Sequence, residues 1–542
     1  MFDSVFGIQV VYKEIIEAIL QYGSFDALHY FGTGNNQQRL LIERMIRKAR
    51  PEGINLFFHN KRRLVCEQKK ICTDVWHNVS DSYISTLYGR EFLSNNKPPI
   101  TYTVHCASKS HELYRNILLQ LLLPFQAYDT IICTSLALRS ALIQQFDIVK
   151  ELIKKTLNIE LEFNGRFTVV PLGVNTERFV SKNKYENRKK LRIPTHATVI
   201  LWVGRFSAFD KADLIPLLRV ISKVIHDESN VHLVLAGHDI KNMRYTPFLK
   251  KYISDFEIEK YITIIENNEI ENRHELIACA DIFISPVDSI QETYGLTPIE
   301  AMACGVPQIV SDWDGYKDTV QDGITGFRIQ TRWYKADDDL DLSSLFFTED
   351  YPYEAFYSHY FLGQSVVVDI FEFERKLRLL ITNRDLREKM SQASISYARE
   401  KLSWPVVVKQ YEEVWIEALT IQKSTPYKEN ILGWELLKNR YYDIFSHYAT
   451  SKISDNERMY LASPEKMIHQ DYYGLGDDLI EMSLAERILS LFKCDENAKG
   501  LSLSEIISQI QTRNRQEVII RSILFLLKNG YLSFEVPNEF TY

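Results

Sequence analysis

Two glutamates, Glu292 and Glu300, lie eight residues apart around a glycine turn. Thr297 suits a helix N-cap and Pro298 the first helical position, so a helix is predicted to begin there with its free N–H groups exposed. Such a helix start binds anions, and Gly295 lets the backbone come close to a phosphate. Glu300 fits a capping box with Thr297, or else accepts hydrogen bonds from ribose hydroxyls. Glu292 has no such local role, and a loop carboxylate beside an anion site indicates a hydroxylated ligand.

A second signal is a pair of cations, Arg205 and Lys211, that follows an apolar run ending at Gly204. Two fixed cations beside a glycine turn suit a diphosphate. They would neutralise the negative charge that develops on a departing nucleotide, a task that a metal ion performs elsewhere. A surface ion pair remains the simpler explanation of this motif taken alone.

The elements that must hold these residues follow an alternating pattern over about 400 residues. Short β-branched and aromatic runs alternate with amphipathic helical stretches, which predicts an α/β fold with open parallel sheets covered on both faces. Strands are predicted at residues 27–31, 54–58, 101–105, 130–134, 167–170, 197–203, 232–236, 262–265, 282–285 and 308–311. A polar stretch at 181–190, followed by Ile193 and Pro194, predicts a linker between two doubly wound halves. The cleft between the halves is the expected site.

The alternation of predicted strands and helices ends after the last of these strands. Residues 330–363 are acidic and aromatic without a clear period, which indicates an insertion, and helical patterns resume at 371–419. Near the C-terminus, helices at 483–493, 502–510 and 516–528 and a short strand after Gly530 are typical of a winged helix. The predicted domains are residues 1–185, residues 186–405 with the insertion, a crossing helix at 406–425 and a mainly helical accessory domain at 426–542.

The composition excludes several classes of protein. Of the 542 residues, 45% are apolar and 25% are charged, which is typical of a globular protein. The 64 basic and 71 acidic residues give a net charge of −7, so nucleic-acid binding by the whole surface is not expected. Seven cysteines without a CxxC pair indicate reduced thiols. No secretion signal and no run of about 20 apolar residues are found, so a cytoplasmic location is expected, and peripheral membrane contact stays open.

The segment from Gly204 to Phe327 resembles the retaining nucleotide-sugar glycosyltransferases of the GT-B architecture, of the family four type. This family is related to sucrose synthase, phosphatidylinositol mannosyltransferase and bacterial glycogen synthase. The resemblance rests on Gly204-Arg205 with Lys211, on Glu292 and Glu300, on the run Glu-Ala-Met-Ala-Cys-Gly-Val-Pro that ends at Pro307, and on Asp322-Gly-Ile-Thr-Gly-Phe327. Weaker similarities, such as Thr103-Val-His105, extend it to about residues 100–420.

The resemblance implies two Rossmann-like domains facing a cleft, joined to the helical C-terminal domain. In the family, the residue matching Glu300 holds the ribose and the one matching Glu292 faces the donor sugar. The matches of Arg205 and Lys211, beside Gly204, stabilise the diphosphate. Backbone groups of the turn assist them and the match of His105 reaches the sugar; the turn residues are Tyr294, Gly295, Leu296 and Thr297.

The reaction implied is retaining transfer from a nucleoside diphosphate sugar, most simply a UDP-sugar, without a cofactor or a metal ion. The departing phosphate itself would take the acceptor's proton on the same face of the sugar. The acceptor, whether glycan, lipid, small molecule or protein, is not encoded in any motif.

Three other sequence features and one related enzyme class allow alternative interpretations. Asp312-Trp-Asp314 fits the Asp-x-Asp pattern of metal-dependent glycosyltransferases, but it follows a strand of the second half, so metal binding is disfavoured here. Cys304 is interpreted as a packing residue, and the acidic run at 337–341 as a solvated loop. A phosphorylase would share the architecture, but the chain shows no pyridoxal-phosphate motif.

Two non-catalytic functions compete with the enzyme. One is a degenerate glycosyltransferase that binds or scaffolds without turnover. The other is a regulator acting through the C-terminal region, in which Arg513, Arg515 and Arg521 would touch DNA phosphates. The nearly balanced charge of that region makes nucleic acid an unexpected ligand and favours a protein partner or an acceptor-docking role for residues 426–542.

Overall fold

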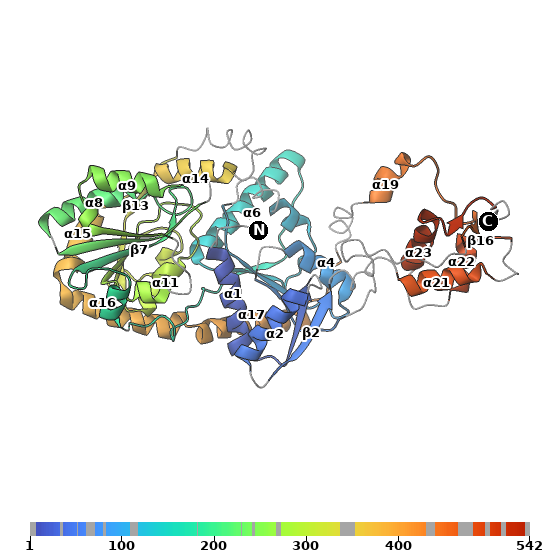
Figure 1. Cartoon of the computed structure of the whole chain (residues 1–542), viewed down its shortest axis with the longest axis horizontal. Helices are drawn as coiled ribbons and strands as arrows, with labels where there is room; N and C mark the ends of the chain where they lie inside the picture. Colours follow the sequence, from blue (N-terminus) through green and yellow to red (C-terminus); the bar gives the residue numbers. More distant parts are fainter. Residues whose placement is uncertain are drawn as a thin grey trace. The chain divides into compact units, whose positions relative to one another are not determined.

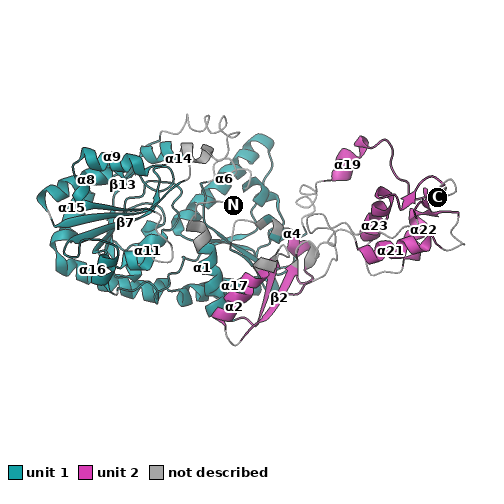
Figure 2. Ribbon diagram, viewed as in Figure 1, with its two compact units in different colours: residues 1–24, 74–87, 98–433 teal, residues 25–73, 88–97, 434–542 magenta. Residues whose placement is uncertain are grey.

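The computed structural model describes residues 7–32, 36–50, 53–60, 71–79, 83–108, 117–181, 183–228, 230–240, 244–266, 273–335, 353–429, 440–463, 481–493, 499–510 and 516–536. The chain divides into two compact units (Figure 2). Unit 1 contains residues 1–24, 74–87 and 98–433, and unit 2 contains residues 25–73, 88–97 and 434–542.

The largest sheet of unit 1 is parallel and six-stranded (Figure 1). Its strands are β7 (Thr198–Phe206), β8 (Val231–Asp239), β9 (Ile262–Glu266), β10 (Ile282–Ser285), β11 (Gln308–Ser311) and β12 (Gly326–Ile329). Their order across the sheet is β12-β11-β10-β7-β8-β9, so the chain reverses its direction of winding between β7 and β10. In doubly wound sheets the crevice at such a reversal, outside the carboxyl ends of the strands, is where ligands bind.

Helices cover both faces of this sheet, as the continuous apolar strands require. One face packs against α8 (Ile215–Asp227), α9 (Thr246–Asp255) and α15 (Ile370–Thr382) through a core that includes the buried Trp202. The other face packs against α10 (Arg273–Ile277) and α11 (Leu296–Ala303). The α16 helix (Arg384–Tyr397) leads through a π-helical turn at Ala398–Leu402 into α17 (Trp404–Ser424).

A four-stranded parallel sheet forms the other half of unit 1. It comprises β3 (Trp76–Asn78), β4 (Ile100–Val104), β5 (Thr130–Cys133) and β6 (Arg166–Val169), in that order, with α1 (Gly7–Tyr22) and α6 (Leu136–Leu157). Helix α17 packs against α1 and reaches this sheet: Tyr411 and Thr103 share a hydrogen bond of 3.2 Å between their hydroxyls, and the Trp415 indole donates to Thr101 over 3.1 Å. The last long helix thus fastens the two halves together.

The N-terminal part of unit 2 contains a parallel pair of strands, β1 (Ala27–Gly32) and β2 (Asn55–Asn60), with α2 (Asn36–Ala49). Helix α4 (Tyr83–Leu93) runs from one unit into the other. All ten strands predicted from the sequence are present, each within a few residues of its expected bounds. Fully buried strands carry continuous apolar runs, which is why they were recognisable.

The C-terminal part of unit 2 has its own apolar core around Ile488, Ile506 and Ile523. It contains α19 (Tyr441–Phe445), α21 (Met482–Leu491), α22 (Leu503–Gln509), α23 (Gln516–Lys528) and a small antiparallel sheet of β15 (Arg458–Leu461), β16 (Leu501–Ser502) and β17 (Leu532–Ser533). The three predicted helices and the last strand are confirmed, and the winged-helix assignment stays a prediction. Arg521 lies on α23, whereas Arg513 and Arg515 lie outside the described residues.

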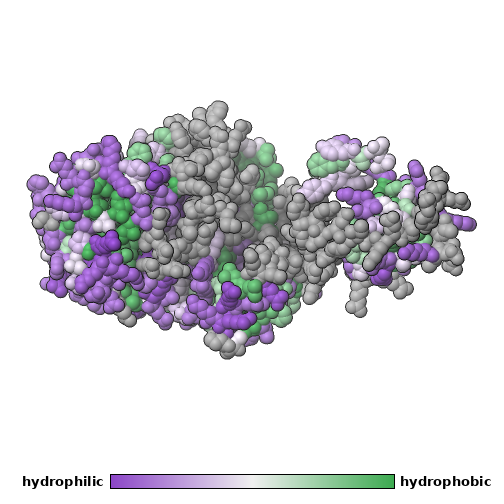
Figure 3. Space-filling model, viewed as in Figure 1, coloured by the Kyte–Doolittle hydropathy of each residue, from purple (hydrophilic) through white to green (hydrophobic). Residues whose placement is uncertain are grey.

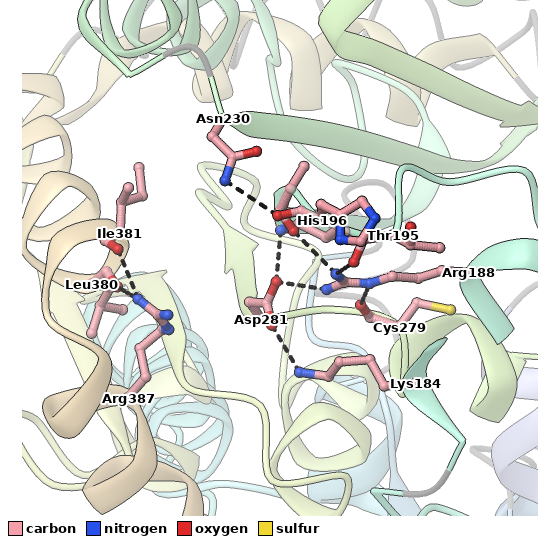
Figure 4. A network of polar contacts seen from close by, with 12 residues as sticks. Lys184, Arg188, Thr195, His196, Asn230, Cys279, Asp281, Leu380, Ile381 and Arg387 are labelled. Atoms are coloured by element: carbon pink, nitrogen blue, oxygen red, sulfur yellow. Dashed lines mark hydrogen bonds and ion pairs between the residues drawn. The ribbon is translucent and has the colours of Figure 1, made fainter. Parts of the chain in front are cut away.

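The polar stretch predicted as a linker lies between β6 and β7, where the chain passes from one half of unit 1 to the other, and it contains a packed helix, α7 (Lys184–Lys190). Its Arg188 side chain is buried and donates to the Asp281 carboxylate over 2.6 Å and to the Cys279 carbonyl over 2.9 Å (Figure 4). Lys184 adds a second ion pair to Asp281. Charged residues are abundant here because they tie α7 to the strand β10, and not because the segment is free in solvent.

The predicted insertion also contains regular structure. Strands β13 (Thr331–Trp333) and β14 (Val366–Val368) pair antiparallel and flank α14 (Tyr353–Ser365). The acidic run at 337–341 lies outside the described residues.

Among the helices that the structure describes, none is long and apolar enough to cross a membrane. Figure 3 shows hydrophilic residues over most of the coloured surface at the left of the view, where Figure 1 places α8, α9, α15 and α16.

Candidate functional site

The reversal of winding between β7 and β10 brings the two sequence signals together. Gly204 and Arg205 lie near the carboxyl end of β7, and Glu292 lies in the loop that leads from β10 to α11. Lys211 forms an ion pair with Glu292. Lys211 and Glu292 are 81 positions apart along the chain. They come together because β7 and β10 are neighbours in the sheet.

Glu292 is held as a carboxylate. Burial alone would raise its pKa, but Lys211, the Tyr294 N–H group and Arg205 bring the pKa below the usual value. The Tyr316 hydroxyl approaches Glu292 Oε2 at 3.5 Å and also lies 2.8 Å from Ser285 Oγ at the end of β10. The charge of Glu292 is therefore fixed beside a cation and a phenol in a nearly dry environment.

Arg205 has a second acidic partner. Its guanidinium donates to the buried Asp210 carboxylate over 2.8 Å, within the loop that connects Arg205 to Lys211. A guanidinium presents five N–H donors in a fixed fork, a geometry that suits the oxygens of both carboxylates and phosphates. Arg205, near the end of β7, and Lys211, in the loop that follows, thus both act on Glu292.

The helix α11 begins two residues earlier than predicted. Gly295 is the N-cap, with a φ of 91°, and Leu296 is the first helical residue, so the prediction that Thr297 caps the helix was wrong. No side chain caps this helix, and the Thr297 hydroxyl is buried without a hydrogen-bond partner. A Cβ at position 295 would lie 2.2 Å from the Tyr316 ring, so only glycine lets the chain turn here against that ring.

Glu300 does not form the capping box that its position allowed. It pairs with Arg273 at the start of α10, and its Oε2 atom is buried without a hydrogen-bond partner. Burial raises the pKa of Glu300 to about 7, against the opposing effect of Arg273. A buried carboxyl with an unused acceptor atom is suited to a ligand hydroxyl.

The loop after β4 meets the Glu292 loop from the other half of unit 1. The Thr293 hydroxyl donates to the His105 carbonyl over 2.9 Å, and the Ser135 hydroxyl donates to the Thr293 carbonyl over 2.7 Å. His105 Nε2 lies 3.0 Å from the Val79 carbonyl oxygen, and burial lowers the pKa of His105 to about 4, so the ring is neutral at pH 7. The structure therefore places His105 beside the Glu292 loop.

Tyr294 has a different role from the other turn residues. Its side chain is buried, and its hydroxyl donates to the Leu172 carbonyl over 2.9 Å. The predicted ligand contact at Tyr294 is thus available to its backbone only, while its side chain fastens the turn to the first half.

The Asp-x-Asp residues differ in environment. Asp312 lies 3.4 Å from Arg328, whereas Asp314 is half-buried, and desolvation together with the charge of Glu292 raises the pKa of Asp314 to about 8. No group of three or more His, Cys, Asp or Glu side chains that could hold a metal ion occurs within the described ranges. Cys304 is buried in the core at the end of α11, as its interpretation as a packing residue expects.

Several partners of the site were missed from the sequence. They have no local motif that links them to the site in the sequence. They are Asp210 beside Arg205, Arg273 beside Glu300, and Tyr316 and Asp314 beside Glu292. Only Asp314 drew attention in the sequence, as part of the metal pattern.

Comparison with known proteins agrees with this geometry. Residues 183–341, which include Arg205, Lys211, Glu292 and Glu300, match the family model described as "Glycosyl transferases group 1". This segment is a group 1 glycosyltransferase domain. The D-inositol 3-phosphate glycosyltransferase of Geodermatophilus obscurus is 29% identical over 175 residues, which cover 31% of this chain and 37% of that protein. The chain therefore spans less than half of the length of the curated relatives that it matches.

Solved structures extend the similarity beyond the group 1 domain. A glycosyltransferase from Rickettsia africae superposes with a TM-score of 0.51 at 17% identity, covering 77% of this chain and 96% of its own. The Anabaena protein HepE, in complex with UDP-glucose, gives 0.50 at 15% identity, covering 76% and 96%. The fold is GT-B, with the group 1 domain as its second half.

Proposed function

We propose that this protein is a retaining glycosyltransferase that transfers a sugar from a UDP-sugar to an acceptor hydroxyl. One observation carries the proposal: the reversal of winding in the group 1 domain brings Arg205, Lys211 and Glu292 together beside the start of α11. The names of relatives and the UDP-glucose bound to HepE support a nucleotide-sugar donor.

Arg205 and Lys211 would bind the diphosphate, with the N–H groups at the start of α11 as further donors. Glu300 would accept hydrogen bonds from the ribose, and Glu292 and His105 would face the donor sugar. The two cations carry the charge neutralisation, so the proposal needs no metal ion.

In the reaction, the bond between the anomeric carbon and the diphosphate oxygen breaks as the acceptor oxygen bonds to the same face of that carbon. The acceptor's proton passes to the departing phosphate oxygen, so no protein nucleophile is required. The main contribution of the protein is the electrostatic stabilisation of the leaving group, and each donor of this kind is worth about 3 kcal/mol.

The test is the release of free nucleoside diphosphate from UDP-, GDP-, ADP- and TDP-sugars, UDP-glucose among them, with and without EDTA. We expect release of UDP from a UDP-sugar, at the same rate with and without EDTA. Arg205→Ala should lower kcat about 100- to 1000-fold. Arg219→Ala, which removes an exposed arginine of the neighbouring helix α8, is the matched control and should leave the rate unchanged. Nucleotide binding without release from any donor would favour the scaffold function instead.

A further inference from the structure

Helix α14, from the inserted segment, lies against the loop that follows β7 and carries Lys211. The Tyr360 ring packs 5.3 Å from the Phe209 ring, measured between centroids. The Gln364 amide donates to Asp213 over 3.2 Å. The insertion therefore packs against the segment that carries Lys211 and is not a remote surface addition.

His359 is a buried polar residue of this helix. Its side chain is only 4% exposed, and Nε2 lies 3.0 Å from the Ser108 carbonyl oxygen. A carbonyl oxygen only accepts hydrogen bonds, so Nε2 carries the hydrogen and donates. Burial lowers the pKa of His359, which keeps the imidazole neutral at pH 7. Nδ1 is then a bare acceptor, and it is buried with no hydrogen-bond partner.

The surroundings of His359 indicate what this acceptor would bind. The carboxylate of Asp210, the partner of Arg205, is close enough to act on His359 electrostatically. Ser108 belongs to the same loop as His105. His359 thus lies between the cation loop and the loop that approaches Glu292. A bare acceptor in the field of a carboxylate disfavours a phosphate oxygen and favours a hydroxyl, and a sugar joined to the diphosphate supplies one.

We propose that His359 is a donor-recognition residue whose Nδ1 accepts a hydrogen bond from a hydroxyl of the donor sugar. This inference rests on the proposed function. It adds a contact from the inserted helix α14 to the contacts that the GT-B halves supply.

Two substitutions separate recognition from a structural tie. In His359→Gln the amide nitrogen can still donate to Ser108, but the acceptor at the Nδ1 position is lost. In His359→Asn the amide oxygen can occupy the Nδ1 position, but the reach to Ser108 is lost. The affinities of both full-length variants and of the original protein for UDP-glucose and for UDP are measured by calorimetry. Thermal unfolding checks that each variant folds.

His359→Gln should weaken UDP-glucose binding about 2- to 12-fold, the range of one neutral hydrogen bond, and leave UDP binding unchanged. His359→Asn should stay within about 2-fold of the original protein for both ligands. Analogues of UDP-glucose that each lack one sugar hydroxyl identify the partner. The analogue that lacks the hydroxyl bound by His359 should bind the original protein more weakly than UDP-glucose does. It should bind His359→Gln as well as UDP-glucose does.

Three results would overturn the inference. Equal affinities of the original protein and His359→Gln for UDP-glucose would remove the contact while leaving the proposed function intact. A loss with His359→Asn but not with His359→Gln would make His359 a structural tie to Ser108. Failure of the original protein to bind UDP or any UDP-sugar would instead refute the proposed function, and the inference with it.

Discussion

The ion pair between Lys211 and Glu292 should contribute far more to stability than a surface pair, because it is nearly dry. The side chains are 16% and 13% exposed. Lys211→Met leaves the Glu292 carboxylate buried without its cation. Breaking a fully buried pair costs about 3–5 kcal/mol, and the remaining solvent access lowers our expectation to about 2–3 kcal/mol. Glu292→Gln removes the stranded charge, so the double variant should regain about 2 kcal/mol of unfolding free energy but no activity.

A double-mutant cycle in urea measures this coupling. Tryptophan fluorescence follows unit 1, since six of the seven tryptophans lie there and Trp434 is the exception. The control cycle uses Lys251→Met and Asp255→Asn, an ion pair of 2.9 Å on α9 whose side chains are 69% and 51% exposed. Its coupling should be far smaller than that of Lys211 and Glu292, because solvent screens both of its charges. Equal couplings in the two cycles would refute the description of the Glu292 site as a dry, charge-paired centre.

Two further predictions concern the turn and helix beside this pair. Burial raises the pKa of Glu300 from 4.5 to about 7, so the folded chain holds more protons than the unfolded chain between these values and its stability falls as the pH rises. Relative to Glu300→Gln, the original protein should lose about 3 kcal/mol of unfolding free energy between pH 4.5 and 7.5, and parallel pH profiles would contradict this. Gly295→Ala should cost about 2 kcal/mol or more in urea unfolding, because its Cβ meets the Tyr316 ring. Gly323→Ala, at a φ of 73° with open space around it, should cost only about 1 kcal/mol, and equal losses would contradict the steric argument.

The sequence was most informative where a strand is buried on both faces. The run from Ile282 to Ser285 is wholly apolar except for its last residue, and its predicted bounds match β10. By contrast, β16 has two residues and β13 has three, which is too short for a period to be read. The polar stretch between the halves lies where the linker was predicted, but the packing of α7 could not be read from it, because ion pairs such as Arg188 with Asp281 are tertiary contacts.

The candidate site was predictable in part for a similar reason. Arg205, Lys211 and Glu292 follow strand ends, and the carboxyl ends of parallel strands lie at one edge of a sheet. Their partners depend on tertiary distance alone: Arg273 lies 27 residues from Glu300, in a short helix without a motif. The N-cap was misplaced because propensity favours Thr297, while the Tyr316 ring and the left-handed turn at Gly295 set the actual start of the helix.

The hydrogen bonds that follow Glu292 have a mechanical consequence. The next two residues, Thr293 and Tyr294, are bonded to His105, Ser135 and Leu172 in the opposite half. Any swing that parts the halves must pull on the chain immediately beside the carboxylate. Glu292 therefore lies next to the hydrogen bonds that join the two halves, so any change in the separation of the halves would also shift its carboxylate.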